Sequence, residues 1–353
     1  MNIGVFVPNW IGDAAMCTPT LRALSRRFPD GNLVGIMRPY VVDVLAGTPW
    51  LRESIIFHHR ASHRSERTWQ VLRRMRHAQL DAVVLLTNSM RSAALAWASG
   101  AGTRVGYARY GRGPLLTHRL YCPRTGSLGL RRLPWPEIDA YLQVAYALGC
   151  EPESPRLELA TLPEDERAAD AVWEKWNLPP GDQVVLLNSS GAYGASKLWP
   201  SEYFAELAAR LASRRGLAVL VVCGPNERDV ARRIVRLANH TRVVSLADEP
   251  ISIGLTKACV RRSRLMVTTD SGPRFFAVAF DVPVITLFGP TDVAWTRTHS
   301  PREVCLNHDV PCGPCGKRKC PLSHHDCMRQ LSVDRVFEAV KQQLDHRRVV
   351  EAA

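Results

Sequence analysis

Short apolar runs alternate with segments of helical period along the whole chain. In the first half, apolar runs predict buried strands at residues 3–7, 33–37, 82–86 and 102–106. The run at 82–86 is too short for a helix, and an unbroken apolar stretch of this length is typical of a parallel strand that is covered on both faces. After the first strand, apolar residues at helical spacing predict one helix over residues 14–28.

The second half repeats the same alternation. Strands are expected at residues 184–188, 217–223, 243–245, 265–269 and 283–288. Helices are expected at residues 201–214, 226–238, 273–280 and 333–347, and Ser201 stands where it would cap the first of them. Strand–helix–strand alternation indicates parallel sheets joined by right-handed crossovers.

A stretch rich in Pro, Glu and Asp, residues 151–183, separates the two halves and contains one expected helix at 164–176. We therefore expect two α/β domains, residues 1–155 and 156–353, each large enough to bury its own core. Ligands of open α/β sheets bind outside the carboxyl ends of the strands. The loops that follow the strands are therefore the first places to search for chemistry.

Composition and charge narrow the class of protein. The chain has 353 residues, and no apolar run approaches the ~18–20 residues that a membrane-spanning helix needs. The first residues read as a strand without a preceding basic segment, so we expect no signal peptide and a cytoplasmic protein. The net charge of +13 favours a polyanionic partner, unless it only reflects an Arg-rich proteome. No nucleic-acid-binding signature accompanies this charge, so nucleic acid is not expected as a partner.

Two Arg- and His-rich stretches, residues 58–76 and 104–132, carry much of the positive charge of the first half. One interpretation is a solvated, loop-rich face. The other is an interface for a phosphorylated, anionic glycolipid, since basic residues near an anionic membrane surface contribute about 1 kcal/mol each.

The loop after the first strand contains Asn9, Trp10, Gly12 and Asp13. A strand that ends in a glycine-containing turn before a helix faces ligands in α/β sheets. Asp13 is either a helix cap or a carboxylate that acts as a general base. The turn has no G-x-G-x-x-G pattern and the chain has no P-loop, which disfavours dinucleotide and P-loop NTPase chemistry.

Three loops of the second half also follow strands and combine small, polar and charged residues. They contain Ser189, Ser190 and Lys197, then Glu227, and then Asp270, Ser271 and Gly272. Exposed backbone N–H groups and a lysine suit a diphosphate. Glu227 would bind ribose hydroxyls or only stabilise the first turn of its helix, and the other loops would otherwise be ordinary solvated turns.

Four cysteines lie close together in the sequence, Cys312, Cys315, Cys320 and Cys327. This density permits a tetrahedral structural zinc site. The spacing is not that of a standard zinc ribbon, so reduced thiols in a Pro-rich loop and a disulfide formed on isolation stay open as alternatives.

Taken together, four blocks resemble the ADP-heptose:lipopolysaccharide heptosyltransferases of glycosyltransferase family 9, most closely the heptosyltransferase II type. They are residues 9–13 (Asn-Trp-Ile-Gly-Asp), 196–200 (Ser-Lys-Leu-Trp-Pro), 269–272 (Thr-Asp-Ser-Gly) and the cysteine block 312–328. The resemblance implies an α/β protein of the GT-B fold, with two Rossmann-like domains whose parallel sheets face across a cleft. It implies inverting transfer of heptose from ADP-heptose to the lipid A-linked inner core, without a cofactor, at the inner membrane.

The resemblance also implies roles for single residues. Asp13 would be the catalytic base in the acceptor domain, whose loop includes Asn9, Trp10 and Gly12. Lys197 would contact the donor phosphates, and the turn at Asp270, Ser271 and Gly272 would bind the donor. Glu227 would lie at the nucleoside.

The chain departs from the family at one position. The family commonly has a His three residues after the glycine of that turn, whereas this chain has Phe275, which cannot donate a hydrogen bond to an anion. Arg274 is the neighbouring residue that could supply the missing charge. A related GT-B transferase with a different nucleotide sugar, or an inactive protein that binds glycolipid or nucleotide sugar, is therefore the alternative function.

Overall fold

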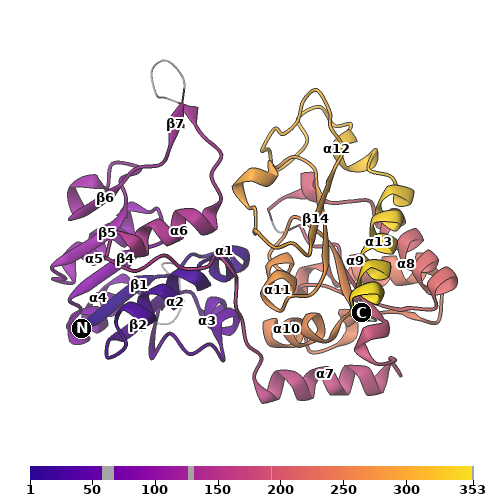
Figure 1. The fold of residues 1–353 in the computed structure, drawn as a ribbon, viewed down its shortest axis with the longest axis horizontal. Helices are drawn as coiled ribbons and strands as arrows, with labels where there is room; N and C mark the ends of the chain where they lie inside the picture. The colour runs from indigo at the N-terminus through magenta and orange to yellow at the C-terminus, as the bar shows by residue number, and fades with distance from the viewer. Residues whose placement is uncertain (58–66, 126–130, 192, 352–353) are drawn as a thin grey trace. The chain divides into compact units, whose positions relative to one another are not determined.

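The computed structural model describes residues 1–57, 67–125, 131–191 and 193–351 (Figure 1). By its internal contacts the chain divides into two compact units. Unit 1 contains Met1–Ala160 and Ala294–His299, and unit 2 contains Thr161–Val293 and Ser300–Ala353. Residues 294–299, expected in the second domain, group with unit 1, where His299 Nε2 lies 3.1 Å from Asp139 Oδ1.

Unit 1 is built on a parallel sheet with the strand order β3-β2-β1-β4-β5-β6. The strands are β1 (Asn2–Phe6), β2 (Asn32–Met37), β3 (Glu53–Ile56), β4 (Ala82–Leu85), β5 (Thr103–Tyr107) and β6 (His118–Leu120). The helices are α1 (Ile11–Met16), α2 (Thr18–Arg27), α3 (Pro39–Leu45), α4 (Thr68–His77), α5 (Met90–Ala98) and α6 (Glu137–Tyr146). A short antiparallel pair, β7 (Arg124–Thr125) and β8 (Arg131–Arg132), stands apart from the sheet.

The single helix expected over residues 14–28 is wrong. The structure has two helices, α1 and α2, which meet at Cys17. Pro19 lies in the first turn of α2, where its missing N–H costs nothing, whereas inside a continuous helix its ring would clash with the preceding turn. The break lets α1 turn away from α2 beside the carboxyl end of β1.

Unit 2 repeats the architecture with the order β11-β10-β9-β12-β13-β14, again all parallel. The strands are β9 (Val184–Asn188), β10 (Ala218–Val222), β11 (Val243–Ser245), β12 (Leu265–Thr269), β13 (Val284–Phe288) and β14 (Glu303–Asn307). The helices are α7 (Pro163–Lys175), α8 (Ser201–Arg215), α9 (Arg228–Ala238), α10 (Ile253–Arg262), α11 (Arg274–Ala279), α12 (Asp326–Arg329) and α13 (Val333–Glu351).

One face of the second sheet is covered by α8, α9 and α13, whose apolar side chains join those of the strands in one core. Leu207 and Leu211 of α8, Ile234 of α9 and Val336 of α13 are completely buried there. Helix α8 ends in the left-handed residue Gly216, as a helix C-terminus favours. Its start differs from the expectation, because Pro200 occupies the cap position and Ser201 makes no capping hydrogen bond.

Both sheets have the strand order typical of dinucleotide-binding folds, in which the direction of winding reverses beside the first strand. The reversal lies between β1 and β4 in unit 1 and between β9 and β12 in unit 2. Loops that leave these strands diverge there, so each unit presents its ligand-facing loops at that point. The parallel α/β architecture expected from the alternation of apolar runs is confirmed.

Candidate active site

In unit 1, the loop after β1 is anchored by residues at the start of α3. The Tyr40 hydroxyl donates to the backbone oxygen of Asn9 at 2.6 Å, and Arg38 Nε donates to the side-chain oxygen of Asn9 at 3.1 Å. The next residue, Trp10, leaves 53% of its surface exposed. A large exposed aromatic residue on an anchored loop is suited to contact a ligand.

Asp13 is the third residue of α1 and is partly exposed, with buried neighbours on both sides. The cap of α1 is Trp10, so the alternative that Asp13 serves as the helix cap is wrong. Burial first, and then the negative charge of Asp13, raise the pKa of Tyr141 well above its ordinary value; the same two causes raise the pKa of the Cys17 thiol. Both groups therefore stay protonated at neutral pH and do not compete as bases.

Near Tyr141, a hollow of about 370 Å³ opens between α6 and the strand ends of unit 1. Its lining includes the polar side chains of Asn88, Arg109 and Glu137. Asn88 comes directly from the loop after β4, at the place where the winding reverses. The hollow therefore combines an apolar wall with a few polar groups, as binding sites for small molecules do.

Arg112 fixes the loop after β4 through buried hydrogen bonds. Its guanidinium is completely buried and donates to the backbone oxygen of Tyr107 at 2.8 Å, to the side-chain oxygen of Asn88 at 3.0 Å and to the backbone oxygen of Thr87. Burial and then the charge of Arg109 lower the pKa of Arg112 to about 10. The prediction that Arg112 belongs to a basic surface facing the membrane is wrong, because the side chain of Arg112 has no contact with solvent.

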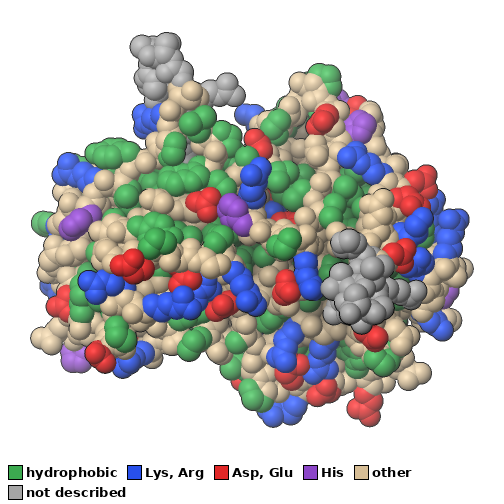
Figure 2. Space-filling view, in the orientation of Figure 1, with side chains coloured by type: hydrophobic (Ala, Val, Ile, Leu, Met, Phe, Trp, Pro, Cys, Tyr) green, Lys and Arg blue, Asp and Glu red, His purple; other side chains and the backbone are tan. Residues whose placement is uncertain are grey.

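The other residues of the two basic stretches differ in exposure. Residues 58–66 lie outside the described residues, as do 126–130, so the structure does not test the predicted role of His58, His59, Arg60, His63 and Arg64. Among those described, Arg67, Arg73, Arg74, Arg76, Arg119 and Arg124 are exposed. Figure 2 shows basic and acidic side chains interspersed on the face in view. No helix among the described residues combines the length and the apolar character that a bilayer crossing would require.

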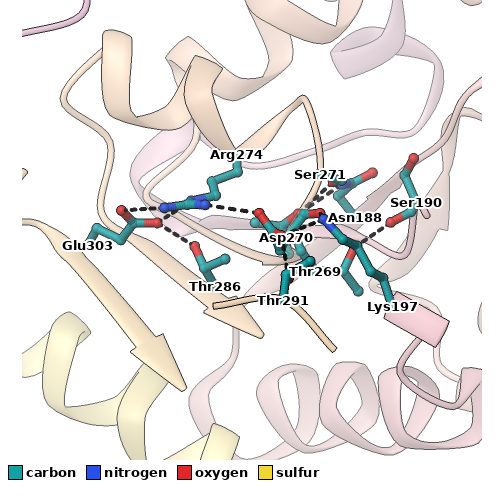
Figure 3. A network of polar contacts seen from close by, with 11 residues as sticks. Asn188, Ser190, Lys197, Thr269, Asp270, Ser271, Arg274, Thr286, Thr291 and Glu303 are labelled. Carbon is teal, nitrogen blue, oxygen red and sulfur yellow. Dashed lines mark hydrogen bonds and ion pairs between the residues drawn. The ribbon is translucent and has the colours of Figure 1, made fainter. Parts of the chain in front are cut away.

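In unit 2, four charged side chains lie in one row, as Figure 3 shows; the row runs from the start of β14 to the loops that follow β12 and β9. In order they are Glu303, Arg274, Asp270 and Lys197. The Arg274 guanidinium pairs with Glu303 (Nε–Oε1, 2.5 Å) and with Asp270 (Nη1–Oδ1, 3.0 Å). Lys197 Nζ donates to the backbone oxygen of Asp270 at 3.0 Å and also to its carboxylate. The charges alternate in sign, and the row ends in the Lys197 ammonium group.

Nearly all of this row is buried. Arg274 has no exposed surface, and only 5% of Asp270 and 9% of Lys197 are exposed. Burial alone would raise the pKa of Asp270, but the Lys197 ammonium and the Arg274 guanidinium hold it below its ordinary value. Burial opposes the charge of Arg274 as well, yet Glu303 and Asp270 raise its pKa. Both groups therefore stay charged, and the row is a fixed electrostatic feature.

The structure brings together Lys197 and Asp270, both predicted from the sequence as site residues. It adds the ion pair between Arg274 and Glu303, which the sequence did not predict. Arg274 is four residues after Asp270, at the start of α11, a spacing that could have signalled their contact. Glu303 begins β14 and gave no local signal, because only the sheet brings it near. The suggestion that Arg274 replaces the missing histidine is wrong, since its charge is used inside the unit. Phe275 is also buried, with its ring centroid 4.8 Å from the Arg274 guanidinium.

The turn after Asp270 presents unpaired donors. Within the described residues, the backbone N–H groups of Ser271 and Gly272 have no acceptor, and both residues are partly exposed. Asn188, at the end of β9, fixes the turn by donating from Nδ2 to Ser271 Oγ at 2.8 Å and to Thr268 Oγ1 at 2.8 Å. Two free N–H groups beside a lysine are an arrangement that suits an anion.

Glu227 connects the loops that follow β9 and β10. Its carboxylate accepts from the backbone N–H of Gly224 at 2.8 Å and from Ser190 Oγ at 2.7 Å. It therefore organises its own turn and also holds the loop that follows β9, and it stays partly exposed. Ser189 differs from its neighbour, because its hydroxyl is buried and is without a hydrogen-bond partner in the described part of the chain.

The cysteine segment closes the same edge of unit 2. A hollow of about 360 Å³ is lined by Cys312, Cys315, Cys320 and Cys327, together with His324 and His325. Burial first, and then the other three thiols, raise the pKa of Cys327. As the described side chains stand, no three His, Cys, Asp or Glu residues are grouped closely enough to hold a metal ion.

Comparison with known proteins agrees with this architecture. The model of glycosyltransferase family 9 (heptosyltransferase) matches residues 68–325, most of the chain. Lipopolysaccharide heptosyltransferase 2 of Escherichia coli K12 is 25% identical over 357 aligned residues, which cover 96% of this chain and 97% of that protein. Lipooligosaccharide heptosyltransferase 2 of Campylobacter jejuni is 27% identical over 167 residues, so there the chain matches only 52% of the relative's length.

A solved structure extends the likeness to the whole fold. The structure of E. coli ADP-heptose LPS heptosyltransferase II superposes with a TM-score of 0.79 and covers 99% of this chain and 100% of that one, at 20% sequence identity. At this identity the superposition establishes the shared GT-B architecture.

Proposed function

Because the chain belongs to glycosyltransferase family 9, the heptosyltransferases, we propose that it transfers a heptose from ADP-heptose to a sugar of the lipopolysaccharide inner core. Unit 1 binds the lipid-linked acceptor and unit 2 binds the nucleotide sugar. The observation that carries the proposal is the match of the family model across both units, joined to polar loops at the winding reversal of each sheet.

Asp13 is the general base of the proposed reaction. A sugar hydroxyl is a poor nucleophile until a base removes its proton during the attack on the anomeric carbon. Asp13 is partly exposed on α1, while the two titratable groups next to it, Tyr141 and Cys17, stay protonated. Attack from the face opposite the leaving group inverts the anomeric centre.

Unit 2 compensates the charge that develops on the leaving ADP. The Lys197 ammonium group has three N–H donors, and two of them bond to Asp270, one to its backbone oxygen and one to its carboxylate. The third donor, with the free N–H groups of Ser271 and Gly272, faces the diphosphate in this proposal. Glu227 keeps spare lone pairs for the ribose hydroxyls, and Ser189 and Ser190 shape the loop between them. These donors belong to the chain, so the transfer step as proposed draws on no cofactor.

The acceptor is a phosphorylated, anionic glycolipid, and we place the working protein at the inner face of the inner membrane. Asn9, Trp10 and Gly12 form the acceptor loop beside Asp13, and the exposed Trp10 offers an aromatic surface to a sugar ring. The hollow near Asn88 and Arg109 supplies polar contacts for the core sugars.

A second candidate is the same transfer chemistry with a different nucleotide sugar. Phe275 favours it, because a buried aromatic ring stands where the family commonly has a histidine. Without that histidine, only Lys197 and the N–H groups of the turn bind the diphosphate. The loss of one contact would change which nucleotide sugars bind well.

Mass spectrometry of the product tests both candidates. The purified protein is mixed with ADP-heptose and a mono-heptosylated inner-core acceptor, and we expect the acceptor to gain one heptose. The Asp13→Asn variant should bind ADP as the wild type does and form product at least about a hundredfold more slowly. If ADP-heptose gives no product but another nucleotide sugar does, the donor assignment fails and the transferase mechanism stands. If no donor is turned over, both fail.

A further inference from the structure

The segment between β14 and α12 has almost no core of its own. Residues 308–325 form no helix or strand, and most of them are exposed, including Leu322 at 59%. Long segments without regular structure are uncommon in compact domains unless something else holds them. Apolar burial contributes little to the conformation of this segment, so hydrogen bonds and any bound ligand have to hold it.

Four thiols supply the chemistry to bind such a ligand. Cys312, Cys315 and Cys320 come from the irregular segment and Cys327 comes from α12, yet all four line the same hollow. The chain turns immediately after Cys315 at Gly316, whose φ of +64° is a conformation that glycine adopts without strain. The sequence spacing of four cysteines within one short segment is thus matched by their convergence in space.

We propose that Cys312, Cys315, Cys320 and Cys327 bind one zinc ion as a tetrathiolate structural site. Four sulfur ligands in tetrahedral arrangement are the donor set that zinc prefers in structural sites. The four cysteines line one hollow, but as the described side chains stand they are not grouped closely enough to hold a metal ion, so the proposed site requires the thiols to turn toward one another on binding. Each thiol releases its proton to solvent as it binds.

The charges around the segment suit this product. One Zn²⁺ with four thiolates carries a net charge of −2. The three residues Lys317, Arg318 and Lys319 are exposed cations that lie between the second and third ligands. Their positive charges offset the negative charge of the cluster.

The proposed zinc site acts through backbone hydrogen bonds on the loop of residues 189–197, which follows β9 and is called the donor loop below. Residues 316–318, between the ligands Cys315 and Cys320, accept three hydrogen bonds from that loop. Tyr193 OH donates to Gly316 O at 2.6 Å, Ser196 Oγ to Lys317 O at 2.5 Å, and Ser196 N to Arg318 O at 3.2 Å. The next residue of the donor loop is Lys197. Zinc would therefore hold the segment that positions the phosphate-facing lysine, and this part of the inference rests on the proposed function.

The two loops pack so closely that only glycine fits at one point. A Cβ atom built on Gly194 would lie 2.3 Å from the backbone oxygen of Arg318. Gly194→Ala therefore separates the loops without removing any thiol. The variant is a second route to the same effect on the donor loop, and it leaves the metal ligands in place.

Metal content is the first measurement. The full-length protein, purified without chelators, should contain about one zinc per chain by plasma mass spectrometry. Cys315→Ser and Cys320→Ser should each lose most of it, whereas Cys122→Ser in unit 1 and His324→Ala should keep it. Replacement of zinc by Co²⁺ should give the intense absorption of a thiolate–cobalt tetrahedral site. Wild-type protein that stays below about a tenth of an equivalent after incubation with zinc would overturn the proposal.

The second measurement is the dissociation constant of ADP, obtained by calorimetry. Cys315→Ser and Gly194→Ala should each weaken ADP binding by roughly tenfold, and only Cys315→Ser should also lose zinc. Full zinc loss with unchanged ADP binding would overturn the link to the donor loop. Zinc content does not depend on the reaction, so a failure of the proposed transferase activity would leave the metal result standing. Circular dichroism verifies that each variant is folded.

Discussion

At the scale of single residues, the buried Arg274 is the centre of the charge balance in unit 2. Its guanidinium pairs with two carboxylates, Asp270 and Glu303, and all three side chains are at least nine-tenths buried. Such groups are costly to bury alone, and removal of one partner leaves an uncompensated charge. The row is therefore a place where one substitution has a large effect on stability.

Arg274→Met should lower the free energy of unfolding of the protein by about 3–5 kcal/mol. Chemical denaturation measures the change. The exposed Arg236 on α9 provides the matched control, and Arg236→Met should change stability by less than about 0.5 kcal/mol. Adding Glu303→Gln to Arg274→Met should recover part of the loss, because it removes one of the unpaired charges. Equal effects of the two single Arg variants would contradict the assigned role.

Asp270 predicts how stability depends on pH. The pKa of this carboxyl is held below its ordinary 3.8 in the folded protein, so the unfolded chain binds the proton more readily. The contribution of Asp270 to stability is therefore complete above that ordinary value and is lost as the pH falls through the lower folded pKa. In denaturation series from pH 6 to pH 2, wild type should lose more stability than Asp270→Asn. Parallel profiles for the two proteins would show that the carboxylate contributes nothing.

Asp13 carries the prediction for catalysis. Asp13→Asn keeps the size of the side chain and removes its basicity, so kcat should fall by about 10²–10⁴-fold while KM for the nucleotide sugar stays near the wild-type value. Steady-state assays of ADP release measure both constants. A fall in kcat of less than about tenfold would remove Asp13 from the role of base.

At the scale of helices and strands, apolar runs located the central strands well. The expected strands at 184–188 and 265–269 match the central strands β9 and β12, because fully buried parallel strands leave unbroken apolar runs. The expected strand at 243–245 matches the edge strand β11, whose three residues are all buried. The edge strands β3, β6 and β14 were missed. Each is only partly buried, as in β14, whose sequence Glu-Val-Cys-Leu-Asn has polar ends. Such partly buried edge strands are set by their pairing with a neighbour, which no local pattern encodes.

The loops show the same division between local and non-local information. Sequence selected Lys197, Ser190, Glu227 and Asp270, because polar residues after apolar runs mark the ends of strands. The sequence did not predict which of these residues contact one another. The contacts of Lys197 with Asp270 and of Ser190 with Glu227 join loops that are far apart in the chain, and only the order of the strands brings them together.

Helix caps provide a test at this scale, because α8 and α10 begin differently. Ser252 caps α10 by accepting from the Leu255 N–H at 2.9 Å, whereas Ser201 in α8 makes no such bond. Ser252→Ala should cost about 1 kcal/mol of stability, and Ser201→Ala should cost less than about 0.5 kcal/mol. Thermal unfolding of the two variants measures the difference. A larger loss for Ser201→Ala would reinstate the cap that the sequence suggested.

At the scale of the whole molecule, each unit has its own sheet and its own core. Independent cores unfold as separate cooperative steps when the contacts between them contribute little. In the proposed function, ADP binds to loops of unit 2, around Lys197 and Glu227. A ligand that binds only a folded state stabilises that state by RT ln(1 + [L]/Kd), which is about 2.7 kcal/mol at a hundredfold excess over Kd.

Saturating ADP should therefore protect unit 2 selectively. Hydrogen exchange should slow in β9, β12 and the turn at Gly272, while β1 and β4 exchange at unchanged rates. Calorimetry should show the transition of unit 2 moving to higher temperature. Lys197→Ala should abolish both effects without changing the exchange of unit 1. Protection that extends equally over both units would mean that nucleotide binding couples them, and the assignment of the donor to unit 2 alone would fail.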